Sequence, residues 1–586
     1  MSELFSAGNG KVFLDKKDRL LMWVFTLVYT VFTLLNLGTV NFPQNTWYGE
    51  PGDSVIIDLG GQKNVSCIWI NSNIYSGQLQ FTGEDGERLI IDQTYGEIFS
   101  WKRKNFETTT SVLRLDVTGG TVDINEIAVF DKNNDMLPVT VSDNAGELFD
   151  EQSTVPERPS YFNGMYFDEI YHARTAYEFL NTMNVYEWTH PPLGKSIIAL
   201  GVMVFGMTPF GWRVMPALFG AAMLPIMFIL AKRLFRRRDM AFLAMALFGL
   251  DTMHFAQTRI STVDVFIVFF ILLMFLFMAD YLRLDNEGRS LKETFVPLGL
   301  CGISFGLGVA SKWTGLYAGA GLAVIFFTHL IRKGIAAKDK NSRKSFWKRT
   351  WLTICFCCVF FLAVPGLIYY LSYTPFYRYE ESLRSAEGSL SFREKLNILI
   401  VQQQSMYSYH SNLTATHLCQ SAWYEWPFTA RSVWFYFSSV GDKISNISSF
   451  GNPAVWWTSS VGALCLITEA VFGRLKDDPS ENKRTFWIIL ASIAANYLPW
   501  TLVPRCTFQY HFFPTVPFII LAAVFLVMRL EERGELPRKA KWIWLAAAGC
   551  FFLLLLPACS GIPMPRLYAR FLEYVLPGGV LFHGTV

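Results

Sequence analysis

Charged residues are scarce in this chain. Asp, Glu, Lys and Arg make up 17% of its 586 residues, against about 25% in ordinary soluble domains. Hydrophobic residues make up 52% and aromatic residues 16%. A soluble globule cannot bury that much apolar surface, so the composition predicts a polytopic α-helical membrane protein. The net charge of +3 is too small to indicate a nucleic-acid partner.

Motifs for several other kinds of chemistry are missing as well. The chain contains no P-loop and no HExxH sequence, which argues against nucleotide-driven or zinc-protease chemistry. Most of its ten cysteines lie in apolar runs, without the paired spacing of a zinc site or a disulfide framework. The first apolar run begins near Leu20 and has no small-residue cleavage site. We therefore expect a retained transmembrane helix there, not a cleaved signal.

Eleven apolar runs reach the roughly 17–25 residues that a membrane crossing needs. They are residues 20–39, 212–232, 239–257, 262–281, 295–311, 314–331, 351–373, 453–472, 485–503, 512–528 and 541–557. A further run at 195–207 is shorter. Basic clusters occur at 11–19, 232–238, 332–349, 474–484 and 529–541.

The positive charges decide how the short run is interpreted. All of the basic clusters fall on one side of the membrane only if residues 195–207 do not cross it. We therefore expect a re-entrant or interfacial helix at 195–207 and about eleven transmembrane helices, with the N-terminus cytoplasmic and the C-terminus outside. Two long loops, at about 41–211 and 374–452, then lie outside.

Residues 45–150 differ from the rest of the chain. Short alternating segments such as "SVIIDL", "SCIWIN" and "VLRLDV" are separated by Gly, Asn and Asp, a pattern typical of a β-sandwich. The segment resembles galactose-binding-like jelly rolls of the discoidin type, particularly in "WYGEPGDSVIIDLG" and "INEIAVFD". Such a module either captures a glycan or substrate, or is a structural cap on the loop.

The stretch "YFDEIYHARTA" places two acids and a histidine just before the short apolar run. On a helix Asp168 and His172 share a face, and Glu169 points about 100° away. A carboxylate beside a histidine suits a general base or a metal site. The alternative is a solvated helix with an ordinary ion pair. The following "THPPLGK" adds His190 and Lys195, where a lipid phosphate could be held.

Further ionisable groups lie in or beside apolar runs, where they are costly and usually functional. Arg259 is a candidate for neutralising a phosphate, and the alternative is a snorkelling arginine paired with Asp264. Lys312 lies between two apolar runs on the expected outer side. Arg505 and His511 add a cation and a hydrogen-bond donor at another outer edge.

The outer loop 374–452 carries His410 and His417 followed by many aromatic residues. Histidines seven apart are neighbours on a helix face, so these two, with His172, are candidates for a metal site. The aromatic residues fit an interfacial belt, a sugar-stacking surface, or both.

These landmarks, taken in order, resemble the protein O-mannosyltransferase family, whose members have the GT-C fold. The matching stretches are "FDEIYHARTA", "HPPLGK", "LDTMHFAQTRISTVD", "SKWTGLY", "YHSNLTATH", "WYEWPFTARSVWFY" and "GNPAVWW". The resemblance spans roughly residues 160–530. No β-trefoil insertion of the MIR type is found in the loop 374–452, which indicates a bacterial-type member.

The resemblance implies an inverting transfer of a sugar, usually mannose, from a polyprenyl phosphate to a Ser or Thr hydroxyl of a protein. Asp168 would be the catalytic base, Glu169 would position the acceptor or donor, and Arg259 would bind the phosphate. His190, Lys195, Lys312, Arg505 and His511 would contact the donor phosphate or sugar. No separate cofactor is required, and a divalent metal stays open. The partners would be membrane lipid, donor lipid and acceptor protein.

The expected organisation follows from these assignments. Residues 1–40 form the cytoplasmic start and first helix, 41–155 the β module, 156–373 the catalytic membrane core, 374–452 an outer loop and 453–586 the last helices. The active site would face outward from the plasma membrane. Alternatives are a GT-C transferase acting on a lipid or cell-wall polymer, a lipid-linked sugar transporter, and a glycan-binding receptor. A transporter should place its ionisable groups near the bilayer midplane.

Overall fold

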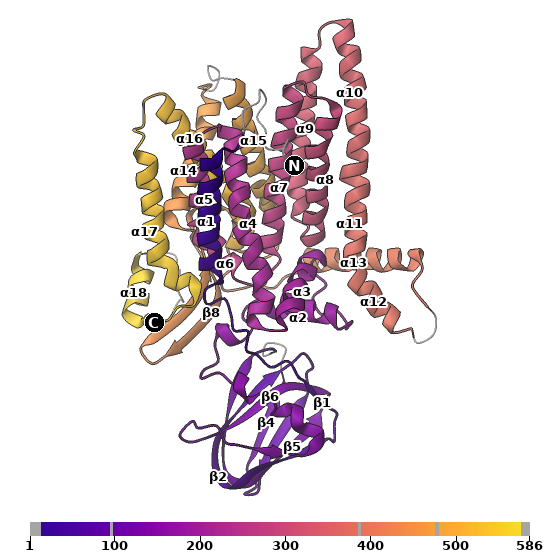
Figure 1. Ribbon diagram of the computed structural model, residues 1–586, viewed down its shortest axis with the longest axis vertical. Coiled ribbons are helices and arrows are strands. Elements are labelled where there is room, and N and C mark those ends of the chain that lie inside the picture. The colour runs from indigo at the N-terminus through magenta and orange to yellow at the C-terminus, as the bar shows by residue number, and fades with distance from the viewer. Residues whose placement is uncertain (1–12, 94–97, 385–387, 475–479, 576–586) are drawn as a thin grey trace. The chain divides into compact units, whose positions relative to one another are not determined.

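The computed structural model describes residues 13–93, 98–384, 388–474 and 480–575 (Figure 1). The chain divides into two compact units. The membrane unit consists of Met1–Leu35, Thr182–Ile197 and Pro216–Val586, and the sheet unit consists of Asn36–Asn181 and Ile198–Met215.

The sheet unit is built on an antiparallel sheet. Its strands are β1 (Trp47–Gly49), β2 (Ser54–Ser72), β3 (Gln78–Gly83), β4 (Arg88–Asp92), β5 (Trp101–Gly119), β6 (Val122–Asp131) and β7 (Thr140–Val141). The order is β1-β6-β2-β5-β3-β4, and β7 pairs with the start of β2. Figure 1 shows the two longest strands, β2 and β5, curving through the whole sheet. Register shifts between Asp58 and Lys63 and between Val65 and Cys67 interrupt β2, and such bulges bend a strand.

Alternation of side chains explains why these segments form strands. Along the first half of β2, Val55, Ile57 and Leu59 are buried while the residues between them are exposed. With Leu113 and Leu115 of β5 they belong to one apolar core. The β module expected from the sequence is therefore confirmed as a β-sheet module, and its classification as a galactose-binding-like β-sandwich stays a prediction. The described strands form one hydrogen-bonded sheet, because β2 and β5 pair with each other and connect β1 and β6 on one side with β3 and β4 on the other.

Three helices carry the segment that follows the sheet. Helix α2 runs over Glu169–Leu180, α3 over Leu193–Phe205 and α4 over Pro209–Phe235. Helix α3 has 13 residues, about 20 Å at 1.5 Å per residue, which is shorter than the roughly 30 Å of hydrocarbon in a bilayer. Its length agrees with a helix that does not cross.

The membrane unit is mainly helical. Its first helices are α1 (Lys16–Leu34), α5 (Arg238–Gly249), α6 (Thr252–Thr258), α7 (Asp264–Asn286), α8 (Leu291–Ser311), α9 (Gly315–Ala336), α10 (Lys340–Cys358), α11 (Val364–Ser372), α12 (Thr374–Ser382) and α13 (Phe392–Asn412). The later elements are β8 (Val433–Val440), β9 (Lys443–Ser449), α14 (Pro453–Val471), α15 (Ser480–Tyr497), α16 (Val516–Glu532), α17 (Ala540–Ser560), β10 (Met564–Pro565) and α18 (Arg566–Val575).

Among the described residues, nine helices are long and apolar enough to cross a membrane. They coincide with nine of the eleven expected spans, and the chain is a multi-pass membrane protein. The other two spans differ in detail. Helix α1 begins with the charged residues Lys16–Arg19. The run 239–257 is broken between α5 and α6, because the Asp251 side chain accepts a hydrogen bond from His254 N and starts a new helix. A total of eleven remains a prediction.

Helices α10 and α11 are joined by a π-helical turn at Val359–Ala363. The turn packs on α8 at Gly302, where a Cβ atom would lie only 2.1 Å from the carbonyl oxygen of Phe360. Because glycine has no side chain, the two backbones can touch there. Exposed leucines along these helices, such as Leu362 and Leu367, fit a surface that faces lipid.

Candidate active site

The start of α2 is held by a buried ion pair. The carboxylate of Glu169 is fully buried and meets Arg213 in two bonds of 2.7 Å, from Nε and Nη2. Trp212 Nε1 donates to the same carboxylate at 3.2 Å. The other guanidinium protons go to three backbone carbonyls, those of Leu37, Tyr161 and Gly164. Such bidentate, fully bonded pairs fix geometry as well as charge.

This ion pair shapes the turn that carries Asp168. Glu169 Oε2 also accepts a hydrogen bond from Tyr166 N at 3.3 Å, which closes the turn around Phe167 and Asp168. Phe167 has φ +50°, a conformation that costs a bulky residue about 1–3 kcal/mol. Asp168 is the N-cap residue of α2, but its side chain does not cap the helix. Glu169 is therefore a positioning residue for a half-buried Asp168.

Lys195 closes the loop that precedes α3. Its buried ammonium donates to the Glu187 carboxylate, to the Glu187 carbonyl at 2.6 Å and to the His190 carbonyl at 2.9 Å. An ammonium has three protons, and these bonds use all three. The charge of Lys195 is thus paired with Glu187, a partner that the sequence argument missed. A phosphate contact from Lys195 stays a prediction.

Two histidines meet beside this loop. The rings of His190 and His410 pack edge to face at 5.8 Å, and His410 Nε2 lies 2.9 Å from the Thr189 carbonyl. Burial, with the neighbouring His190, lowers the pKa of His410 to about 4, and burial likewise lowers the pKa of His190. Both rings are neutral at pH 7. His410 Nδ1 is buried and has no hydrogen-bond partner in the part of the chain that the structure describes, so it is left to accept a bond from a ligand.

The remaining cations of the membrane unit differ in their partners. Lys312, at the end of α8, lies 2.7 Å from the carboxylate of Asp264 in the first turn of α7. Arg505 follows α15 and is half-exposed, and it makes no hydrogen bond or ion pair with any residue described here. Its charge nevertheless acts on His410 and His511, as does that of Lys312. Arg505 is thus a cation without an acid in a basic neighbourhood.

Arg259 contacts the end of α1, and its expected role at a phosphate stays a prediction. Its buried guanidinium donates to the carbonyls of Thr33 and Leu35, the latter at 2.7 Å. These carbonyls lie at the end of α1, so Arg259 caps that helix. Asp264, the partner that the sequence offered for Arg259, binds Lys312 instead.

The proposed histidine metal site is not assembled as expected. Helix α13 ends at Asn412, so His410 and His417 do not share a helix face. His417 Nδ1 instead accepts a hydrogen bond from Cys419 N at 3.0 Å. His172 is buried in α2 of the sheet unit.

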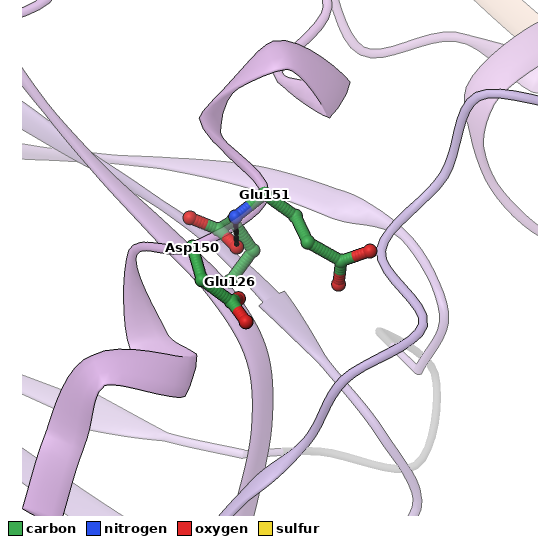
Figure 2. Close-up of side chains that lie close together, drawn as sticks. All are labelled: Glu126, Asp150 and Glu151. Carbon is green, nitrogen blue, oxygen red and sulfur yellow. Dashed lines mark hydrogen bonds between the residues drawn. The ribbon is translucent and has the colours of Figure 1, made fainter.

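One acidic group in the described residues has the spacing of a metal site. Figure 2 shows Glu126 on β6 with Asp150 and Glu151, whose ligand atoms lie within 4.8 Å of one another. Internal hydrogen bonds occupy these carboxylates. Glu126 accepts from Glu151 N at 2.9 Å and from the Gln152 amide, and Glu151 accepts from the backbone of Gln44 and Asn45. Burial raises the pKa of Glu126 to about 8. At pH 7 the Glu126 carboxyl therefore carries a proton, which disfavours the binding of a cation.

An open cleft of about 780 Å³ lies along α13 in the membrane unit. Trp188 and Tyr409 meet edge to face at its wall, with ring centroids 5.8 Å apart. The other lining residues are uncharged: Gln404, Ser405, Ser408, Asn412, Leu413, Thr414 and Ala415. Tyr409 also touches His410, so the cleft borders the histidine pair.

Comparison with known proteins places this architecture in a family. A model described as dolichyl-phosphate-mannose-protein mannosyltransferase matches residues 204–376, and one for the C-terminal four-transmembrane region of protein-O-mannosyltransferase matches 395–573. Together these ranges take in more than half of the chain. Asp168, Glu169, His190 and Lys195 precede the first matched range.

Individual relatives agree with the family models. A polyprenol-phosphate-mannose–protein mannosyltransferase of Corynebacterium glutamicum is 27% identical over 59% of this chain and 72% of its own length. One from Mycobacterium tuberculosis is 24% identical over 68% of this chain and 84% of its own length. In structure, the chain resembles the protein O-mannosyltransferase Pmt1–Pmt2 complex of Saccharomyces cerevisiae bound to its sugar donor, with a TM-score of 0.59, 15% identity, and coverage of 70% of this chain and 88% of that one.

The Glu169–Arg213 pair predicts a large and non-additive effect on stability. Arg213→Met leaves a buried carboxylate without its partner and should lower the stability of the full chain by about 3–5 kcal/mol. The double replacement Glu169→Met/Arg213→Met should recover much of that loss, because no charge stays buried. Thermal unfolding in detergent measures both. Arg114→Met, at an exposed pair with Asp116, should cost at most about 1 kcal/mol. A double variant as unstable as the sum of the singles would contradict this account.

The raised pKa of Glu126 predicts a dependence of stability on pH. The folded chain keeps this proton up to about pH 8, while the unfolded chain releases it near pH 4.5, so stability should fall as pH rises through that interval. Between pH 7 and 9, Glu126→Gln should flatten the slope of unfolding temperature against pH. Asp123, with a pKa raised by burial to about 6, titrates below that window.

A control variant and a calcium titration complete the test of this prediction. Glu157→Gln, at an exposed acid of the sheet unit, is the matched control and should leave the slope as it is. Stabilisation by added Ca²⁺ that disappears in Glu126→Gln would mean that the three carboxylates bind a cation and would overturn the protonated assignment.

Proposed function

This chain belongs to the protein O-mannosyltransferase family, and we propose that it transfers mannose from a polyprenyl phosphate to Ser or Thr hydroxyls of proteins. The observation that carries the proposal is Arg505. It is a cation without an acidic partner among the described residues. Its positive charge and that of Lys312 both act on His410 and His511, so the two cations lie near the same pair of rings. A site with uncompensated positive charge at helix ends suits a lipid phosphate.

Asp168 is the proposed base. Its carboxylate takes the proton from the acceptor hydroxyl, whose oxygen attacks the anomeric carbon of the donor sugar. The bond between that carbon and the phosphate oxygen breaks, and the phosphate leaves with the electron pair. Arg505 and Lys312 stabilise the charge that develops on the phosphate. Attack from the side opposite the leaving group inverts the anomeric centre.

Two residues of the expected site, each in the first turn of a helix, act as positioning residues in this proposal. Glu169 fixes the turn of Asp168 through Arg213, and Lys195 fixes the turn of His190 through Glu187. The neutral His410 offers Nδ1 as a hydrogen-bond acceptor, which suits a sugar hydroxyl. His511 lies in the same basic neighbourhood.

The location of the cations supports an outward-facing enzyme over a transporter. Lys312 lies just before α9, and the opposite end of α9 carries Arg332 and Lys333. By the positive-inside rule, the end with Arg332 and Lys333 is cytoplasmic and the end with Lys312 is external. Lys312 and Arg505 flank helix ends, whereas a transporter binds its substrate near the midplane. A plasma-membrane location with an external site is therefore part of the proposal.

The acceptor is the least constrained part of the reaction. The cleft along α13 supports a polypeptide, because its aromatic, hydroxyl and amide side chains suit an uncharged extended chain and its wall borders His410. A lipid or cell-wall polymer is the second candidate for the acceptor.

Removing the proposed base should abolish transfer without abolishing donor binding. We expect Asp168→Asn to lower the rate of transfer of labelled mannose from polyprenyl-phosphate-mannose to protein by about 10²–10⁴-fold. Glu157→Gln is the matched control and should transfer at the normal rate. Label that β-elimination releases from protein identifies Ser or Thr as the acceptor, whereas label in lipid or polymer would exclude the protein acceptor. Normal transfer by Asp168→Asn would remove Asp168 from the mechanism.

Arg505 should act on the donor phosphate. Arg505→Gln should raise the KM for polyprenyl-phosphate-mannose and lower kcat, because the lost charge helps both ground state and leaving group. We expect a loss in kcat/KM of about 10²–10³-fold, with partial rescue by Arg505→Lys. Arg570→Gln, which removes an exposed cation of α18, should change neither constant. An unchanged kcat/KM in Arg505→Gln would contradict the assignment of Arg505 to the donor phosphate.

A further inference from the structure

A second basic cavity lies in the membrane unit, at the opposite ends of helices that flank the proposed phosphate site. Its volume is about 810 Å³, and it opens between α7, α9 and α15. Helix α9 starts beside Lys312 and ends in this cavity, and α15 starts in this cavity and ends before Arg505. With 22 residues, α9 is about 33 Å long, so the two basic sites lie a full membrane thickness apart.

The mouth of the cavity carries excess positive charge. Among the residues that the structure describes, its basic lining residues are His329, Arg332, Lys333 and Arg484, and its acidic lining residue is Glu481. Asp285 is nearby and already meets three basic side chains, those of His329, Lys333 and Arg349, at 2.6–2.9 Å. Glu481 is 2.9 Å from Arg236. Asp285 and Glu481, two acids at this mouth in the described part of the chain, are therefore engaged.

Two arginines at this mouth form no ion pair with a described residue. Arg332 is exposed near the end of α9, and Arg484 is half-buried in the second turn of α15. Within the residues that the structure describes, neither forms a hydrogen bond or an ion pair. Guanidinium groups present paired N–H donors that match phosphate oxygens, so this mouth suits a phosphate.

The base of the cavity is apolar. Its deeper walls come from Val324 and Ile325 of α9 and from Ile488 and Ala491 of α15. Ile488 is about one helical turn from Arg484, and the other three are about two turns, or roughly 10 Å, from the arginine of their own helix. One turn deeper the helices meet, because a Cβ atom on Gly321 would lie 2.4 Å from Cβ of Ala495. The helices thus touch at Gly321 and spread apart toward the basic mouth. Trp487, half of whose surface is exposed, stands at the rim, as tryptophan does at a membrane interface.

We propose that this cavity binds a membrane lipid through its phosphate headgroup. The arginines would hold the phosphate at the membrane surface, and the start of a hydrocarbon chain would fill the apolar base. A cavity that is charged at the mouth and apolar below fits such a lipid better than a soluble anion, which would leave the base empty. Both an anionic phospholipid and a polyprenyl phosphate have the required chemistry.

Native mass spectrometry of the full chain in detergent tests this site. Phosphatidylglycerol, phosphatidylcholine and polyprenyl phosphate are titrated separately, with inorganic phosphate as competitor. We expect phosphatidylglycerol or polyprenyl phosphate to bind at least about tenfold more tightly than phosphatidylcholine. The tighter of the two identifies the lipid that occupies the site. Displacement of either by millimolar inorganic phosphate would mean a site for a free anion and would overturn the lipid assignment.

Matched variants separate the cavity from general charge. Arg332→Gln/Arg484→Gln should lower the affinity for phosphatidylglycerol or polyprenyl phosphate to that for phosphatidylcholine. Lys344→Gln/Lys348→Gln removes the same charge from the exposed start of α10 and should retain the preference. Ala491→Phe keeps every charge but fills the base, and should also weaken lipid binding about tenfold. The proposal would be overturned if the arginine and lysine variants preferred the anionic lipid over phosphatidylcholine to the same extent. The comparison requires that the two variants have equal unfolding temperatures without lipid.

Discussion

The cost of burying charge in an apolar bundle governs this molecule. An ionised group taken out of water is tolerated only when a partner and further hydrogen bonds compensate it. The buried charges obey this rule one after another: Glu169 with Arg213, Lys195 with Glu187, Lys312 with Asp264, and Arg529 with Glu469. Backbone carbonyls at the end of α1 compensate Arg259. Arg505 and Arg484 are half-buried and form no ion pair with a described residue, so each offers its charge to a ligand. Exposed Arg332 lies at the same cavity mouth as Arg484.

The same rule separates the ionisable residues proposed to take part in the reaction from those whose ion pairs fix the local backbone. Glu169 and Lys195 sit in sequence motifs that attract attention as catalytic groups, yet their charges are fully used inside the protein. They fix the turns that carry Asp168 and His190. A residue beside the chemistry is therefore not necessarily part of it, and the hydrogen-bond count decides.

Hydropathy and charge predicted most of the fold, because long apolar runs and basic clusters are local signals. Nine spans and the β module follow from them directly. The break at Asp251 was missed because an N-cap inside an apolar run looks like an isolated charge. Glu187 and Arg213 were missed as partners because pairing is decided by tertiary structure, although Arg213 within "GWRVMP" is a charge in an apolar run and was a usable signal. The helix that was to join His410 to His417 ends at Asn412, which spacing alone does not reveal.

The π turn between α10 and α11 couples two distant parts of the sequence. Its backbone at Phe360 occupies the space where residue 302 of α8 would otherwise carry a side chain. A π turn accommodates one residue more than the regular helix around it. The shape of the segment 359–363 therefore restricts residue 302 to glycine, because any Cβ atom there would collide with the Phe360 carbonyl.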